Sequence, residues 1–197
     1  FRPEFNIMAS RDLNDAAAKR NPIRAAIGEF GTPLLIRGIN ALGNLLPKNV
    51  DLKSAALIEP LSCAVRGFDQ LPRNPGSHYL IYGSGTMGLM MAELAKVNGA
   101  ASVSIVDLNQ DKLKTAKVLG FTNLAKSADE FDQPRGFDVV IDCTGVTEAI
   151  KDGLKHVMPG GTFLQFGVAN KGAKVEIEPF WVYNKEITIV GSMAVLH

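Results

Sequence analysis

The sequence has few cysteines, no long apolar run and almost no net charge. Two cysteines, Cys63 and Cys143, are too few for a disulfide framework, which favours a reducing, cytoplasmic location. The three histidines, His78, His156 and His197, show no ligand-like spacing. The apolar runs are far shorter than the roughly 18 residues of a membrane-spanning helix. Because 21 basic and 20 acidic side chains leave a formal charge of +1, we expect neither nucleic acid nor a membrane as partner.

What is present is an alternation of β-rich runs with helical segments, in a chain of 197 residues that suits one domain with an appendage. Strands are predicted at residues 78–83, 101–107, 122–127, 137–145, 159–167 and 186–193, and helices at 86–99, 109–120 and 146–157. Such an alternation predicts right-handed βαβ crossovers and a parallel sheet covered on both faces. The predicted fold is therefore a doubly wound α/β domain of the Rossmann type.

The N-terminal part of the sequence differs in character from this alternation. Residues 1–45 read as short helices of unassigned origin and are predicted to be a helical appendage. Residues 46–77 are predicted to be a helical connector that starts at Asp51, breaks at Pro60 and continues as a second helix. The α/β domain then occupies residues 78–197. Since the first residue is a phenylalanine, we expect either a fragment or a chain that carries added residues at its start. No basic, apolar leader follows, so no secretory signal is expected.

The stretch "HYLIYGSGTMGLMMAELAKVNGA" carries a G-x-G-x-x-G turn between a strand and a helix. Gly83 would allow the tight turn, Gly85 the approach of a pyrophosphate, and Gly88 the packing of helix on sheet. The N–H groups of Thr86, Met87 and Gly88 would point at the phosphates. The pattern predicts a dinucleotide site, although glycines can also fill such a turn in a βαβ unit that binds nothing.

An acid supports the cofactor interpretation. Asp107 ends the second predicted strand, about twenty residues after the glycine turn. A carboxylate there can accept hydrogen bonds from both ribose hydroxyls of the adenosine and would repel a 2′-phosphate. Neither Leu108 nor Asn109 offers a positive charge, so NAD(H) is favoured over NADP(H). S-adenosylmethionine-dependent methyltransferases also pair a glycine loop with such an acid, but the complete glycine motif and the strand "VIDCTG" argue against them.

Several segments together resemble the medium-chain dehydrogenase/reductase family, in particular its zinc-dependent polyol group of sorbitol and threonine dehydrogenases. They are "LPKNVDLKSAALIEPLSCAVRGFDQL", the glycine-turn segment, "VSIVDLNQDKLKTAKVLG", "FDVVIDCTG", "MPGGTFLQFGV" and "ITIVGSM", in the order of the family. The resemblance covers about residues 46–197. It implies NAD-dependent hydride transfer with a secondary alcohol or polyol, of which this chain contains the cofactor-binding part.

The resemblance also implies roles for individual residues. Glu59 corresponds to a glutamate that faces the catalytic zinc, and Lys112 to a lysine that supports Asp107. Two further groups correspond to segments beside the cofactor and its nicotinamide, namely Cys143, Thr144 and Gly145, and Phe166, Gly167 and Val168. Each also has a structural interpretation: Phe166 and Val168 as sheet core, Lys112 as a solvated residue, Cys143 as a buried small hydrophobe and Glu59 as a surface acid.

The sequence lacks the other parts of such an enzyme. A Gly-His-Glu segment and a zinc-ligating cysteine before residue 59 are missing, as are four closely spaced cysteines for a structural zinc. There is thus no complete catalytic domain, and we expect no zinc in this chain and no alcohol or polyol turnover unless that domain is supplied. The alternative function is a catalytically silent NAD-binding or assembly module. An apolar last strand, with Ile187, Ile189 and Val190, suggests a homodimer built by edge pairing.

Overall fold

The computed structural model describes residues 56–193. The chain divides into two units, Phe1–Ala56 and Leu57–His197, and the described helices and strands belong to the second. In chain order these are α6 (Ile58–Phe68), β1 (His78–Tyr82), α7 (Thr86–Val97), β2 (Ser102–Val106), α8 (Gln110–Val118), β3 (Asn123–Ala125), η2 (Ala128–Glu130), β4 (Phe137–Asp142), α9 (Thr147–Lys155), β5 (Val157–Gln165), α10 (Pro179–Lys185) and β6 (Thr188–Gly191). The helices expected within residues 1–45, the boundary at residue 45 and the helix start at Asp51 lie outside the described residues.

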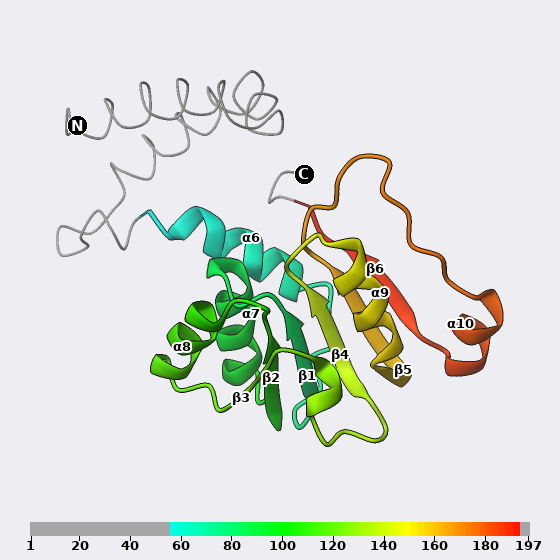
Figure 1. Cartoon of the computed structure of the whole chain (residues 1–197), viewed down its shortest axis with the longest axis horizontal. Coiled ribbons are helices and arrows are strands. Elements are labelled where there is room, and N and C mark those ends of the chain that lie inside the picture. Colours follow the sequence, from blue (N-terminus) through cyan, green and yellow to red (C-terminus); the bar gives the residue numbers. More distant parts are fainter. Residues whose placement is uncertain (1–55, 194–197) are drawn as a thin grey trace. The chain divides into compact units, whose positions relative to one another are not determined.

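The six strands form one parallel sheet in the order β3-β2-β1-β4-β5-β6 (Figure 1). The chain builds outward from β1 through β2 to β3, and then returns to the other side of β1 for β4, β5 and β6. The strand order therefore reverses between β1 and β4, where Leu80 pairs with Val140. In open α/β sheets this reversal opens a crevice at the carboxyl ends of the strands, where ligands bind.

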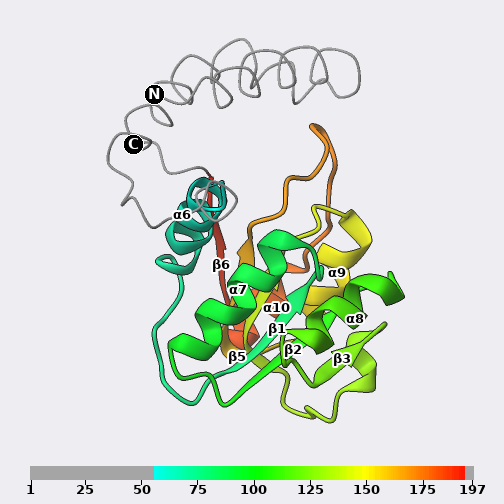
Figure 2. The same cartoon turned by 90° about the vertical axis from the view of Figure 1, so that its left-hand side faces the viewer.

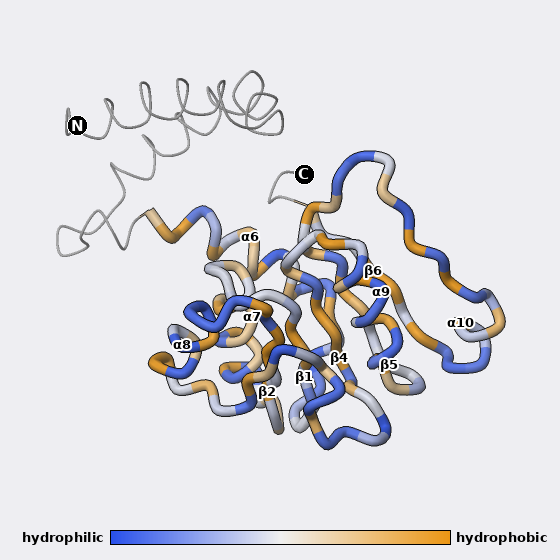
Figure 3. Tube along the Cα trace, in the orientation of Figure 1, coloured by the Kyte–Doolittle hydropathy of each residue, from blue (hydrophilic) through white to orange (hydrophobic). Residues whose placement is uncertain are grey.

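Alternate residues of the strands supply two separate cores, as the predicted doubly wound fold requires. Tyr79 and Ile81 of β1 pack in the core beneath α6, α7 and part of α8. Leu80 and Tyr82 face the opposite core, which α9, η2 and α10 cover. The central strands are largely apolar and the connecting loops more polar (Figure 3). Since each fully buried side chain of this size contributes about 1.5–3 kcal/mol, both faces stabilise the sheet.

Local sequence signals account for the ends of α8 and for the start of α7. The side chain of Asn109 caps α8 by accepting hydrogen bonds from the backbone N–H groups of Asp111 and Lys112. Gly120, at φ +87°, follows the end of that helix in the left-handed conformation that glycine tolerates. By contrast, the N-cap of α7 is Gly85, which has no side chain to cap the helix, and the first turn of α7 contains no acid. The N-terminus of α7 therefore retains its uncompensated positive dipole end.

The structure differs from the sequence analysis at α6 and at α10. The break predicted at Pro60 is wrong, because α6 begins at Ile58 and contains Pro60 in its first turn, where the missing N–H has no intrahelical partner to lose. Helix α10 was not expected. It has seven residues, none of them buried, and follows the extended loop after β5 (Figures 1 and 2). Among the described helices, none has the length and apolar character needed to cross a bilayer.

Candidate functional site

The glycine turn lies at the carboxyl end of β1, beside the point where the strand order reverses. Gly83 has φ +100°, and its N–H donates to the carbonyl oxygen of Val106 at 2.8 Å. A Cβ on Gly88 would overlap the carbonyl oxygen of Gly83, so the turn and α7 touch backbone to backbone. Gly83 is thus required by conformation and Gly88 by close packing.

Gly85 is different, because nothing in the described protein requires a glycine there. Its backbone is extended, with φ −81° and ψ −176°, and a Cβ added to it would meet no atom within 4 Å. The space that this Cβ would enter lies at the N-terminus of α7. The first-turn residues Thr86, Met87 and Gly88 follow it directly. This arrangement fits a ligand that approaches the backbone and carries negative charge.

Asp107 follows β2 directly and is held beside the glycine turn. Its Oδ2 accepts from the Ser84 N–H and its Oδ1 from the Asn109 N–H, each at 2.8 Å. The buried Ser84 hydroxyl donates to the carbonyl oxygen of Lys112 at 3.1 Å, which ties the turn to α8. A carboxylate has about four acceptor sites, so the two backbone bonds leave capacity for hydroxyl donors.

Lys112 lies next to this carboxylate. Its Nζ is 3.9 Å from Asp107 Oδ2, and the lysine side chain is 53% exposed. An ion pair this long and this exposed adds little to stability, at most about 1 kcal/mol. The pair of Lys112 and Asp107 therefore contributes little to holding the fold together.

The other predicted residues lie at the carboxyl ends of β4 and β5. Gly145 has φ +70°, and a Cβ on it would collide with the carbonyl oxygen of Val168. A Cβ on Gly167 would collide with the backbone nitrogen of Gly145. The structure thus brings the segment Cys143–Gly145 against the segment Phe166–Val168, and both glycines permit this contact.

The flanking side chains of these segments have distinct surroundings. Phe166 is partly buried and packs beside Gly67 of α6, whereas Val168 is 76% exposed and does not belong to the sheet core. Cys143 is partly buried. Burial, followed by the negative charge of Asp142, raises the pKa of its thiol, which therefore stays protonated near neutral pH. Thr144, which lies between Cys143 and Gly145, is exposed.

Sequence reasoning missed two residues of this region, Asp142 and Gln165. Asp142 is fully buried, and its Oδ1 accepts from the backbone N–H of Thr144 at 3.0 Å and from the hydroxyl of Thr144 at 2.6 Å. Its Oδ2 accepts from the N–H of Gly145 at 2.9 Å and from Gln165 Nε2 at 2.7 Å. Gln165 Nε2 also donates to the carbonyl oxygen of Gly167 at 2.6 Å. In the sequence, Asp142 could have been noticed as an acid at the end of an apolar, β-branched strand.

Comparison with known proteins places this geometry in a family. The zinc-binding dehydrogenase family matches residues 86–196, more than half of the chain. The chain belongs to the zinc-binding dehydrogenase family. It is 37% identical over 167 residues to D-arabinitol dehydrogenase 1 of Uromyces fabae, covering 76% of this chain and 46% of that protein. It is also 32% identical over 158 residues to D-xylulose reductase of Saccharomyces cerevisiae, covering 74% of this chain and 44% of that protein.

Solved structures agree with this membership of the zinc-binding dehydrogenases. A structure assigned to a zinc-binding dehydrogenase of Sinorhizobium meliloti, bound to NADP, matches with a TM-score of 0.71 and 33% identity over 76% of this chain and 46% of that one. L-Idonate 5-dehydrogenase of Escherichia coli matches with a TM-score of 0.66 and 27% identity, over 75% and 44%. The chain spans less than half the length of these relatives, and it contains the NAD(P)-binding part of a dehydrogenase.

The described residues of this chain do not form a zinc site by themselves. Glu59 is exposed on α6, one turn from Cys63, whose thiol lies 3.4 Å from Glu59 Oε1. Within residues 56–193, no three His, Cys, Asp or Glu side chains gather closely enough to hold a metal ion. Since zinc sites use three or four protein ligands, these residues do not fit zinc on their own.

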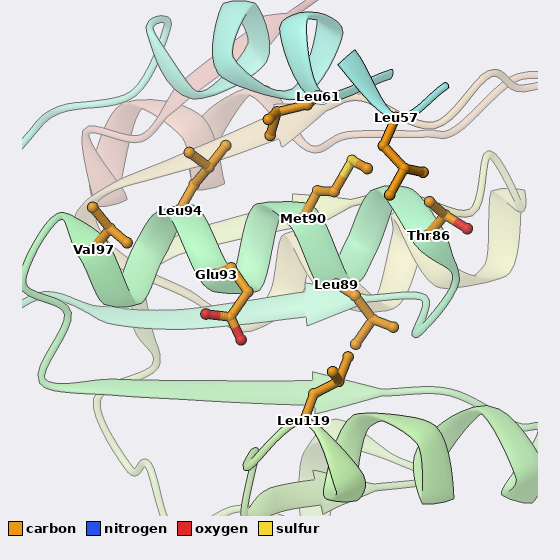
Figure 4. A pocket seen from close by; sticks show the side chains of 9 residues that line it. All are labelled: Leu57, Leu61, Thr86, Leu89, Met90, Glu93, Leu94, Val97 and Leu119. Atoms are coloured by element: carbon orange, nitrogen blue, oxygen red, sulfur yellow. The ribbon is translucent and has the colours of Figure 1, made fainter. Parts of the chain in front are cut away.

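An apolar groove lies along α7 and reaches Thr86 of the glycine motif, but neither the three glycines nor Asp107 line it. It encloses about 360 Å³ and is lined mainly by leucines from α6 and α7, with Thr86 at one end (Figure 4). Glu93 is its charged lining residue. The groove offers neither a positive group nor the glycine backbone, so it does not suit phosphates.

Proposed function

We propose that this domain binds NAD(H) across the carboxyl ends of its strands, as the cofactor half of a zinc-type alcohol or polyol dehydrogenase. The observation that carries the proposal is Gly85, because the fold does not need a glycine there whereas a pyrophosphate does. A bound cofactor would supply hydride transfer to and from the carbon of a secondary alcohol. The chain's own residues bind and orient the cofactor.

Each part of the cofactor has proposed partners. The N–H groups of Thr86, Met87 and Gly88, at the positive end of the α7 dipole, would bind the pyrophosphate. Asp107, supported by Lys112, would accept hydrogen bonds from the hydroxyls of the adenosine ribose. Two segments would flank the nicotinamide half, and they comprise Cys143, Thr144, Gly145, Phe166, Gly167 and Val168.

We further propose a preference for NAD(H) over NADP(H). Asp107 is fixed by two backbone N–H groups and cannot turn away easily from a 2′-phosphate. Two negative charges within about 4 Å repel each other strongly in a partly buried site. The similar structure from Sinorhizobium meliloti is bound to NADP. The preference of this chain between NAD(H) and NADP(H) therefore has to be measured directly.

The Asp107→Ala variant is expected to bind NADH at least about ten- to a hundredfold more weakly, because the loss of even one hydrogen bond to a charged group costs about 1.5–3 kcal/mol. Its affinity for NADPH should fall much less or rise, since the repulsion of the 2′-phosphate is removed. Fluorescence titration with both cofactors measures the ratio. The control is Asp111→Ala, which removes an exposed acid of α8 paired with Lys114. Unchanged NADH affinity in Asp107→Ala would refute the assignment, and equal weakening of both cofactors would refute the stated preference.

Turnover is proposed for the complete enzyme, with a polyol or small secondary alcohol as substrate once a catalytic domain is supplied. The proposal draws on relatives that act on arabinitol and xylulose. Glu59 is the residue we propose to face a metal held mainly by that domain, and we expect the chain alone to bind no zinc. The alternative is a catalytically silent NAD-binding or assembly module. Zinc content and polyol-dependent NADH formation separate the two functions. A cytoplasmic location remains a prediction.

A homodimer through β6 is a further proposal. Within residues 56–193, β6 forms one edge of the sheet, and Ile189 on it is 43% exposed. Exposed strand edges pair readily with another chain, and a charge on such an edge opposes pairing. Light scattering is expected to give a dimer at micromolar concentration and to give a monomer for Ile189→Lys. A monomeric wild-type chain throughout that range would end the dimer proposal.

A further inference from the structure

The topology assigns the two halves of a bound dinucleotide to different strands. The strand order reverses between β1 and β4, and a dinucleotide lies across that reversal with its pyrophosphate at the glycine turn. Asp107, at the end of β2, is on the adenosine side. The second nucleoside must therefore lie over the ends of β4 and β5, where residues 143–145 and 166–168 meet.

One buried carboxylate fixes the backbone of both segments at this place. The side chain of Asp142 holds the turn through the N–H groups of Thr144 and Gly145, and it holds Gln165 through its amide. Gln165 in turn holds the carbonyl oxygen of Gly167. The backbone carbonyl of Asp142 also accepts from the N–H groups of Phe166 and Gly167, at 3.0 and 2.7 Å. The position of one segment is thereby coupled to that of the other.

We propose that Asp142, acting with Gln165, is a positioning residue for the nicotinamide half of the cofactor. The proposal rests on the NAD(H) function proposed above. It adds that different residues serve the two halves of the cofactor. The glycine turn and Asp107 set the affinity for the adenosine diphosphate part. The buried Asp142–Gln165 pair sets the spacing of the two segments that receive the nicotinamide riboside.

An asparagine cannot replace Asp142 in this network. Each carboxylate oxygen accepts two donors, so an amide nitrogen at either place would face two N–H or O–H groups. Turning the Gln165 amide to present its oxygen would remove the donor from the carbonyl oxygen of Gly167. Unpaired polar groups are costly in a buried site, so the segments are expected to move apart.

The test compares ligands that differ in the nicotinamide. The 197-residue chain is titrated with NADH and with ADP-ribose, which lacks the nicotinamide, and the fluorescence of bound NADH is recorded. Asp142→Asn is compared with Gln165→Met, which removes the amide from a partly exposed position. The control is Asp138→Asn, the same substitution on the same strand at the far end of the sheet, where the carboxylate accepts from the N–H of His78 at 2.7 Å.

The expected result is a selective loss. Asp142→Asn and Gln165→Met should bind NADH about tenfold more weakly and with altered fluorescence, while ADP-ribose affinity stays within about twofold. Asp138→Asn should bind both ligands like the wild type. If Asp142→Asn does not fold, the Gln165→Met result decides. Equal losses of both ligands, or none, would overturn the positioning role. A wild-type chain that binds neither ligand would instead overturn the proposed function itself.

Discussion

Replacing Gly85 by valine is expected to abolish NADH binding while leaving the domain folded. The two effects separate because a side chain at this position enters open space in the protein and would occupy the path of the pyrophosphate. The backbone at Gly85 is extended, so valine is conformationally acceptable there. We expect the dissociation constant to rise at least about a hundredfold, which corresponds to about 2.7 kcal/mol.

Calorimetric titration with NADH and thermal unfolding measure the two properties on the same sample. The free energy of unfolding should change by no more than about 1 kcal/mol, since valine is a poorer N-cap than glycine. Wild-type affinity in Gly85→Val would contradict the placement of the cofactor. A variant that unfolds would show that the protein itself needs this glycine.

Replacing Gly88 by alanine should have the opposite pattern, a large loss of stability. The new Cβ would overlap the carbonyl oxygen of Gly83, and the neighbouring atoms are backbone rather than flexible side chain. Forcing an extra methyl group into such a contact costs about 3 kcal/mol. For a domain of this size the melting temperature should fall by roughly 10 °C.

The matched control for Gly88→Ala is Gly85→Ala, the same substitution three residues earlier in the same motif. It meets no atom within 4 Å and should alter the melting temperature by only a few degrees. If both variants melt alike, the close packing of α7 on the turn does not limit stability. Together, the expected results would show that the motif serves the ligand at Gly85 and the fold at Gly88.

Strongly periodic features were predictable from the sequence. The alternation of β-branched strands with amphipathic helices predicted a parallel, doubly wound sheet, and the structure confirms it. The apolar residues of "HYLIYG" and "FDVVID" became the paired central strands β1 and β4. Short elements with few buried residues carry little periodic signal, which explains why α10 was not expected.

The residues that act through others could not be found from local patterns. Asp142 and Gln165 are 23 positions apart and become partners only because β4 and β5 pair in register. The hydrogen bond from the Ser84 hydroxyl to the carbonyl oxygen of Lys112, which joins the glycine turn to α8, also depends on the fold and was not expected. Asp107 and the glycines were predictable because their spacing follows from a single βαβ unit.

The most direct test of the account is calorimetric titration of the purified 197-residue chain with NADH. The account predicts one binding site per chain with a dissociation constant on the order of micromolar, about −8 kcal/mol. Competition by ADP-ribose should follow, because the adenosine half carries its own contacts. The absence of binding heat and of any NADH fluorescence change across the micromolar to millimolar range would contradict the central claim that this domain is a working cofactor site.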